Sequence, residues 1–126
     1  MKETKFFICE HCKNIVGVIN DAGVPMMCCG KKMTQLVPGA VEASAEKHLP
    51  VVSLEGGVLH AFVGEAEHPM TEAHNIAWIY LETEKGGEIK YISPDGKPEA
   101  FFNIGEDKPV AVFAYCNLHG LWKTEI

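Results

Sequence analysis

The sequence contains no arginine and no long hydrophobic run. Its 126 residues include eleven lysines against seventeen carboxylates, and the formal net charge is −6. Proteins that bind nucleic acids need a basic surface and favour the bidentate guanidinium group, so this composition excludes a nucleic-acid partner. The apolar runs are interrupted within about eight residues, whereas a membrane-spanning helix needs roughly twenty. We therefore expect no membrane-spanning segment.

The N-terminus also lacks the apolar stretch of a secretory leader, since only Phe6–Ile8 separates the polar start from Cys9. We therefore expect a cytoplasmic protein. The five cysteines are odd in number, so a framework built only of disulfides would leave one thiol over. In a reducing compartment, closely spaced cysteines more often bind a metal or carry out redox chemistry.

The chain divides by composition into three parts. Residues 1–36 hold four of the cysteines and many turn signals, and so small a module needs a crosslink or a metal to fold. Residues 37–47 are rich in small and turn-forming residues and are predicted to be a linker. Residues 48–126 carry only strand patterns. The chain is thus predicted to be a small metal module followed by an all-β domain.

The β domain is predicted from short apolar runs separated by turn signals. Gly56-Gly57 is typical of a two-residue hairpin, because both positions of a type I′ turn need positive φ. Runs at this spacing favour an immunoglobulin-like antiparallel β-sandwich. The predicted strands are Phe6–Ile8 and Ile15–Ile19 in the module, then Val51–Glu55, Val58–Val63, Ile76–Thr83, Glu88–Ile92, Ala100–Ile104 and Val110–Tyr115.

The first candidate site consists of Cys9, Cys12, Cys28 and Cys29. A C-x-x-C step lets two thiolates converge on one ion, and four thiolates make a tetrahedral site suited to zinc or iron. Adjacent cysteines normally point to opposite sides, so ligation by both requires a distorted backbone. A Cys9–Cys12 disulfide or a dithiol redox pair is the alternative. His11, inside the C-x-x-C loop, is predicted to be solvated.

The second candidate site collects residues at the predicted strand ends: His48, His68, His74, Cys116 and His119. Loops on a rigid sandwich commonly carry functional sites. One sulfur with several imidazoles suits iron or copper better than structural zinc. Copper is disfavoured, because all the methionines precede the last cysteine, whereas a blue-copper site usually takes an axial methionine after its histidine. His60 lies in mid-strand and is predicted to be structural.

Three segments of the second part resemble the signature segments of the desulfoferrodoxin family of two-iron superoxide reductases. They are Glu46–Pro50, His68–His74 and Cys116–Gly120, and the four-cysteine module resembles the desulforedoxin-like N-terminal domain of the same family. The resemblance spans nearly the whole chain, with the ligand positions in order. A small departure is Leu49, where a smaller β-branched residue is expected.

The resemblance implies two irons per chain. One would be an Fe(Cys)4 centre in residues 1–36; the other would be a mononuclear centre in residues 48–126 with four equatorial imidazoles, the axial thiolate of Cys116 and one open position. It implies one-electron reduction of superoxide to hydrogen peroxide. It also implies roles for Lys47, as the cation that attracts superoxide, and for Glu46, as the carboxylate that fills the open position after oxidation.

Other interpretations remain at this stage. Without the resemblance, Glu46 and Lys47 are a solvated charge pair. The resemblance also implies a homodimer and a rubredoxin-type electron donor. The alternatives to the enzyme are a non-catalytic electron-transfer protein of the rubredoxin or desulforedoxin type, and a binding module that is stabilised by zinc and attached to a β-sandwich. Both leave the five-residue set around Cys116 unexplained.

Overall fold

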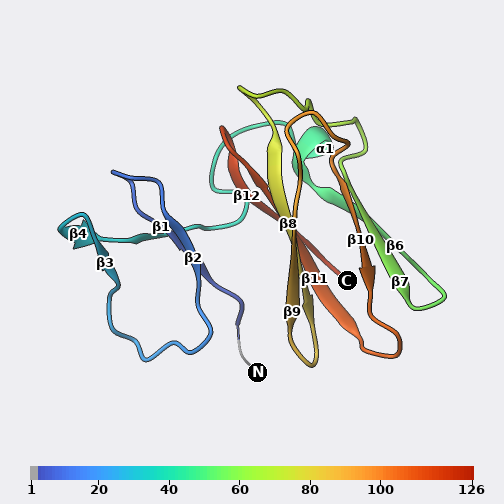
Figure 1. Ribbon diagram of the computed structural model, residues 1–126, viewed down its shortest axis with the longest axis horizontal. Helices are drawn as coiled ribbons and strands as arrows, with labels where there is room; N and C mark the ends of the chain where they lie inside the picture. Colours follow the sequence, from blue (N-terminus) through green and yellow to red (C-terminus); the bar gives the residue numbers. More distant parts are fainter. Residues whose placement is uncertain (1–2) are drawn as a thin grey trace. The chain divides into compact units, whose positions relative to one another are not determined.

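The computed structural model describes residues 3–126, which form two compact units, one ending at Val37 and one running from Pro38 to Ile126 (Figure 1). The first unit contains a three-stranded antiparallel sheet with strand order β2-β1-β5 and a separate β3-β4 hairpin. Its strands are β1 (Phe6–Ile8), β2 (Ile15–Gly17), β3 (Met27–Cys28), β4 (Lys31–Lys32) and β5 (Thr34–Gln35).

The first unit has little apolar core. Among its described residues, the buried hydrophobic side chains are Phe6, Ile8 and Cys9, while Ile19 and Val24 are largely exposed. Burial of so few apolar side chains cannot offset the conformational entropy of ordering a module of this size. The unit therefore depends on its cysteines, as the sequence predicts.

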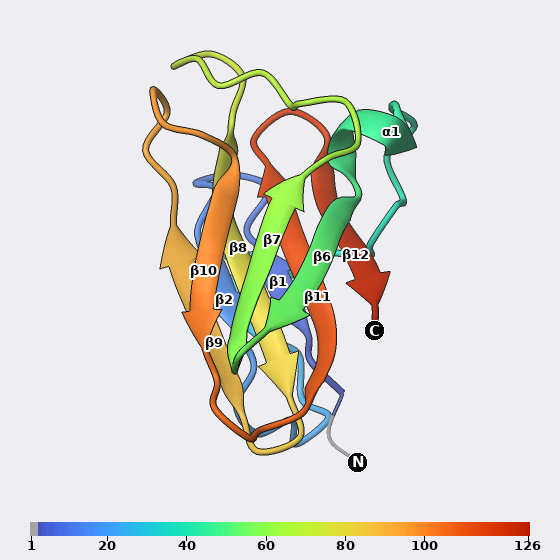
Figure 2. The ribbon, with the colours of Figure 1, turned by 90° about the vertical axis from the view of Figure 1, so that its right-hand side faces the viewer.

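The second unit is a β-sandwich of two antiparallel sheets (Figure 2). One sheet has the strand order β10-β7-β6 and the other β12-β11-β8-β9. The elements are α1 (Ala45–His48), β6 (Pro50–Glu55), β7 (Val58–Val63), β8 (Ile76–Thr83), β9 (Gly87–Tyr91), β10 (Glu99–Asn103), β11 (Pro109–Cys116) and β12 (Gly120–Glu125). The predicted all-β fold class is confirmed.

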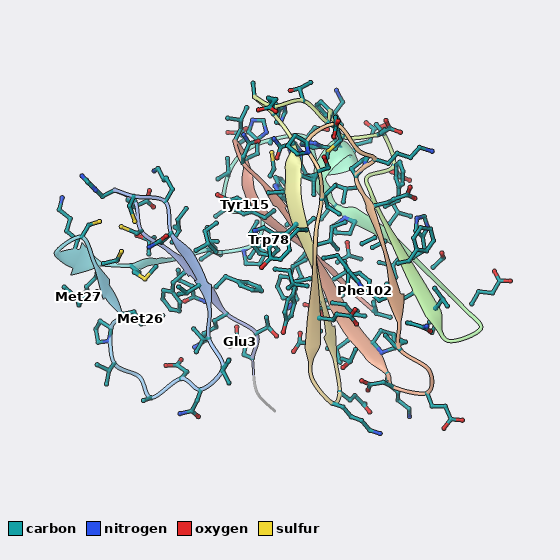
Figure 3. The ribbon with its side chains drawn as sticks, viewed as in Figure 1. Glu3, Met26, Met27, Trp78, Phe102 and Tyr115 are labelled. Atoms are coloured by element: carbon teal, nitrogen blue, oxygen red, sulfur yellow. The ribbon has the colours of Figure 1, made fainter. Side chains whose placement is uncertain are left out.

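Alternation along the strands builds the core between the two sheets. Along β7, Leu59, Ala61 and Val63 are fully buried, and their neighbours face outward. Phe102 of β10, labelled in Figure 3, is fully buried in the same cluster. β8 and β11 lie in the middle of their sheet and are nearly continuous in apolar residues, as expected for central strands.

The local geometry matches the sequence prediction at some points and departs from it at others. The predicted bounds of β1, β7 and β8 are reproduced, and Gly56 and Gly57 both have positive φ, 59° and 77°. Strand β12 was not predicted. Residues Pro38 onward, predicted as linker, belong to the second unit, and α1 begins at Ala45 within them. In the described part of the chain, no helix is long and apolar enough to cross a membrane.

Candidate metal centres

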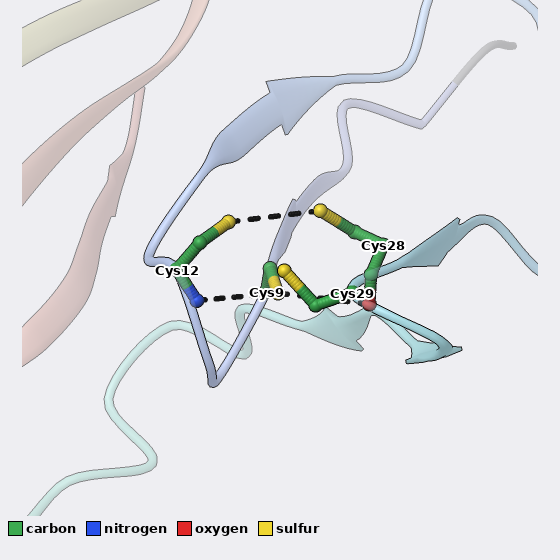
Figure 4. A group of neighbouring side chains, drawn as sticks. All are labelled: Cys9, Cys12, Cys28 and Cys29. Carbon is green, nitrogen blue, oxygen red and sulfur yellow. Dashed lines mark hydrogen bonds between the residues drawn. The ribbon is translucent and has the colours of Figure 1, made fainter.

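The four cysteines of the first unit converge on one point (Figure 4). Their sulfur atoms all lie within 4.8 Å of one another, and Sγ of Cys12 lies 3.6 Å from Sγ of Cys28. A tetrahedral ion with metal–sulfur bonds of ~2.3 Å would place neighbouring sulfurs about 3.8 Å apart. All the cysteines are free thiols, so the disulfide alternative is not supported. The cluster has the dimensions of a tetrathiolate metal site.

The backbone distortion required by adjacent cysteine ligands lies at Cys29. This residue has φ 52°, and Gly30 follows with φ 73°, in the turn between β3 and β4. The left-handed conformation is uncommon for a residue with a side chain. Here it accompanies the convergence of both adjacent sulfurs on one point. On the other side of the cluster, Lys13 (φ 68°) donates its N–H to the Cys9 carbonyl oxygen at 2.8 Å and closes the C-x-x-C turn.

Backbone and side-chain hydrogen bonds set the protonation of these thiols. The backbone N–H of Cys12 donates to Sγ of Cys9 at 3.5 Å, and this lowers the pKa of Cys9 to about 6. A side-chain hydrogen bond with Cys12 raises the pKa of Cys29 to about 12. Neighbouring thiolates repel each other, so each thiol is harder to ionise when the others are ionised. A bound cation compensates this repulsion and allows all four to be thiolates. Cys12 and Cys29 are exposed, so the centre lies at the surface of its unit.

The second candidate site lies at one end of the sandwich, where three connections meet (Figure 2). α1 provides His48, the β7–β8 connection provides His68 and His74, and the end of β11 with the turn after it provides Cys116 and His119. These are the five residues predicted from the sequence, and the structure brings them together. For His48, His68, His74 and Cys116 the candidate ligand atoms all lie within 4.8 Å of one another.

The four imidazoles form a square. Neighbouring ring centroids are 4.7 Å apart for His48–His68, 4.6 Å for His68–His74, 5.1 Å for His74–His119 and 5.0 Å for His119–His48. Each neighbouring pair is nearly perpendicular, with interplanar angles of 77°, 79°, 79° and 86° in the same order. The diagonal pair His48–His74 is wider, at 6.5 Å.

The hydrogen bonds of two of these rings fix their tautomers. Nδ1 of His48 donates to the carbonyl oxygen of Ser44 at 2.6 Å, and Nδ1 of His68 donates to that of Pro69 at 2.7 Å. In the neutral rings each Nε2 therefore carries a lone pair, yet the two Nε2 atoms lie only 3.2 Å apart. Two lone pairs cannot hydrogen-bond to each other, so a cation between them is favoured.

The distances agree with such a cation. A square of imidazoles around an ion with metal–nitrogen bonds of ~2.1 Å places adjacent nitrogens about 3.0 Å apart. The observed separations are 3.2 Å between Nε2 of His48 and His68, and 3.1 Å between His48 Nε2 and His119 Nδ1. Nε2 of His74 is buried and is the one such side-chain N or O atom in residues 3–126 without a hydrogen-bond partner. The donor set thus fits a metal ion.

Burial favours the neutral form of three of these imidazoles. Desolvation lowers the pKa of His48 and His74, and lowers that of His68 to about 4. The positive charge of Lys47 adds to the lowering of pKa at both His48 and His74, so its ammonium group acts on the site although the residue is exposed. Neutral imidazoles are the form that binds metal.

Cys116 lies at the end of β11 with its thiol fully buried. Its Sγ accepts the backbone N–H of His119 at 3.4 Å and lies 3.8 Å from Nδ1 of the same residue. Burial raises the pKa of the Cys116 thiol, and the N–H donors of the turn oppose that rise. A cation would hold the sulfur as thiolate.

Two asparagines that the sequence interpretation did not single out join the loops of the site. The backbone N–H of Asn75 donates to Oδ1 of Asn117 at 2.9 Å, and Nδ2 of Asn117 donates to the Ala73 carbonyl oxygen at 3.0 Å. They hold the segment of His74 against the turn of Cys116. The sequence could have indicated these two residues, because each asparagine directly follows a predicted metal ligand.

The remaining candidates lie elsewhere. Glu46 is exposed and lines a groove of about 780 Å³. The groove is formed by α1, β6 and the C-terminal end of the chain: Ala45, Glu46, Leu49, Pro50, Val51, Val52, Leu54, Glu65, Thr124, Glu125 and Ile126. His11 is exposed. His60 stacks on Phe101 at 4.4 Å, and its Nε2 lies 2.8 Å from Oε1 of Glu99, which is a structural arrangement.

Fold and sites together define a metalloprotein in which a β-sandwich holds a buried imidazole–thiol centre and a small unit holds four thiols. The family model for desulfoferrodoxin matches residues 40–125. A desulfoferrodoxin of Nitratidesulfovibrio vulgaris is 40% identical over 121 residues, covering 96% of this chain and 95% of the relative. The chain belongs to the desulfoferrodoxin family.

Solved structures agree. The superoxide reductase from Treponema pallidum matches with a TM-score of 0.84 and 35% identity, over 98% of this chain and 100% of the other. A one-iron superoxide reductase from Giardia intestinalis matches with a TM-score of 0.55 and 33% identity, over 64% of this chain and 97% of its own. With this family and these two donor sets, the chain is a two-iron protein, with one tetrathiolate site and one imidazole–thiolate site.

Proposed function

We infer that the protein is a superoxide reductase, which reduces superoxide by one electron and releases hydrogen peroxide after two protons are added. The observation that carries this function is the square of four imidazoles, two of them buried, beside a buried thiol. Relatives named as superoxide reductases support it, including one from Pyrococcus abyssi that is 36% identical over 99 residues. An open coordination position is typical of catalytic metal sites.

We assign the ligands as follows. Cys9, Cys12, Cys28 and Cys29 would hold the first iron, and His48, His68, His74, His119 and Cys116 would hold the second. His119 enters the assignment through Nδ1, which is 3.1 Å from His48 Nε2. Five protein ligands would leave the metal one position free for the substrate. Iron bound by these residues would supply the electron for superoxide, and the thiolate would raise the electron density of the iron.

Lys47 is assigned the electrostatic role. The chain carries a net charge of −6, which repels an anionic substrate. The ammonium group of Lys47 acts on His48 and His74, so its charge is felt at the imidazole plane. A cation there attracts superoxide and can hold a hydrogen-bonded water that delivers protons to it. This assignment replaces the alternative of a solvated charge pair.

Glu46 is assigned the carboxylate that fills the open position after the iron is oxidised. The residue precedes Lys47 in α1, and it lies two positions before His48. Because Glu46 lines the groove beside β6, its carboxylate has to turn toward the imidazole plane for this role. The proposal therefore includes a movement of the Glu46 side chain.

The first centre and the assembly belong to the same proposal. We propose residues 1–36 as the desulforedoxin-like domain, 37–47 as a linker that groups with the second unit from Pro38 and contains the start of α1, and 48–126 as the reductase domain. The exposure of Cys12 and Cys29 favours electron exchange with another protein, and we propose a rubredoxin-type donor. The free thiols are compatible with a reducing cytoplasm. A homodimer is proposed on family membership alone.

The yield of hydrogen peroxide tests the function. A reductase supplied with an electron donor forms one peroxide for each superoxide consumed, whereas a dismutase forms one for every two. Iron and zinc should be measured on the same sample. About two irons per chain with the full yield support the reductase. Two irons without peroxide would instead support the electron-transfer protein, which the exposed first centre favours.

A further inference from the structure

Trp122 of β12 contacts two neighbouring corners of the imidazole square. Its indole ring stacks on His48 with centroids 4.9 Å apart and an interplanar angle of 27°, and its Nε1–H donates to the His119 carbonyl oxygen at 3.0 Å. The side chain is 6% exposed. It therefore fixes a ring face of one imidazole and the backbone of another.

These two corners come from segments far apart in the chain. His48 ends the four-residue helix α1, and His119 lies in the turn before β12. A helix of four residues has too few internal hydrogen bonds to hold its own orientation, and its N-cap Ser44 makes no side-chain cap hydrogen bond. The indole joins α1 to the β11–β12 turn through its stacking on His48 and its hydrogen bond to His119.

The opposite edge of the square is held differently. His68 is oriented by its hydrogen bond to the Pro69 carbonyl oxygen, and the segment of His74 is tied to the β11–β12 turn through Asn75 and Asn117. Those groups act through polar contacts within and between loops. The edge between His48 and His119 is also held by the indole of Trp122. This indole belongs to strand β12, and a strand within a sheet is more rigid than a loop.

We propose that Trp122 is a positioning residue for the imidazole–thiolate centre. Its indole sets the orientation of the His48 ring and the position of the His119 backbone, and through them the affinity of the site for iron. Groups that orient metal ligands typically change metal affinity by 10–100-fold when they are replaced. The proposal rests on the assigned ligand set, and it does not depend on the reaction that the bound iron carries out.

The test compares Trp122→Phe with Trp78→Phe in the full-length two-iron protein. Both changes replace a buried indole by a phenyl ring, but the indole of Trp78 lies in β8, where it stacks on Tyr115 of β11. Trp122→Phe keeps an aromatic ring near His48 and removes the N–H donor. The readouts are Fe(II) affinity of the sandwich centre against a chelator and the position of its visible absorption band after oxidation.

We expect Trp122→Phe to weaken Fe(II) binding about 10–100-fold and to shift the band, while Trp78→Phe changes neither. The bands of the tetrathiolate centre serve as reference in each sample. A lower unfolding temperature in both variants with unchanged affinity and band would overturn the proposal. A peroxide yield that fails the reductase test leaves these two readouts valid, so the two failures are distinguishable.

A second measurement needs no variant. In the metal-free protein with ¹⁵N-labelled tryptophan, the indole N–H of Trp122 should be protected from exchange with solvent. Its resonance should move when Zn²⁺ fills the site, because the His119 carbonyl and the His48 ring are both its neighbours. The Trp78 resonance serves as control. A Trp122 resonance that stays in place on Zn²⁺ binding would also overturn the proposal.

Discussion

The two metal sites of this chain are built in opposite ways. In the first unit, thiols from two turns converge in a region with almost no apolar core, and two of the four cysteines are exposed. In the second, imidazoles and a thiol converge on the end of a sandwich that has its own buried core. The first site holds its unit together, whereas the second is held by its unit. We therefore expect the first unit to unfold when its metal is lost and the second unit to stay folded.

The largest effect should come from Cys116→Ser. A serine oxygen binds iron more weakly than a thiolate and does not push electron density onto it, so reductase activity and the thiolate-to-iron charge-transfer absorption should be lost. The sandwich should stay folded, because its core does not depend on the ion. Circular dichroism and the tetrathiolate bands would show that folding and the first centre are intact. Retained activity would show that the thiol has been assigned wrongly.

The complementary change is Cys12→Ser in the first unit. Binding of a metal to four thiolates typically provides about 10–16 kcal/mol of the folding free energy of such modules, so the unit should lose its metal and unfold. Limited proteolysis should then cleave residues before Val37 while residues 38–126 resist. Superoxide reduction should remain within about twofold when electrons come from a small-molecule donor. If activity disappeared with the first centre, the two sites would not be independent.

Acid should act on the second unit after its metal has been removed. Burial lowers the pKa of His68 to about 4 from an ordinary value of 6.5, so the folded state binds fewer protons than the unfolded state between those values. Its stability is therefore complete above pH 6.5 and falls as the pH drops toward 4, by up to about 3 kcal/mol. Thermal unfolding against pH would measure this. A flat profile would show that His68 is not buried in the metal-free protein.

The smallest predicted effect is that of Lys47→Ala. Removal of the local cation should slow the reaction with superoxide about tenfold, equivalent to about 1.4 kcal/mol. Pulse radiolysis gives this rate directly. Lys85→Ala is the matched control: it changes the net charge equally, but Lys85 lies in the β8–β9 hairpin, at the other end of the sandwich (Figure 2). Equal rates in the two variants would remove Lys47 from the mechanism.

The sequence predicts the parts of this structure that are determined by residues close together in the chain. The bounds of β7 and β8 follow from apolar runs between turn signals, and Cys29 carries the backbone distortion that two adjacent cysteine ligands require. Cys116 and His119 were found because one turn contains them both. Such features are encoded within a few neighbouring residues.

The features that were not predicted depend on contacts between distant segments. Strand β12 begins with a glycine and has charged residues at two of its six positions, and pairing with β11 makes it a strand. α1 is a single helical turn, too short to show the apolar periodicity from which a helix is predicted. Asn117 acquires its role only where its side chain reaches Ala73 and Asn75, 44 and 42 residues away. Contacts between residues so far apart in the chain leave no pattern within a short stretch of sequence.

The span between His48 and His119 has a mechanical meaning. Their facing nitrogens are 71 residues apart in the chain, so one ion bound by both closes a loop of most of the second unit. Closing a loop of that length reduces the entropy of the unfolded chain by an amount worth about 4 kcal/mol when a covalent crosslink does it. An iron bound by both residues would act as such a crosslink, and its loss would leave the second unit less stable as well as inactive.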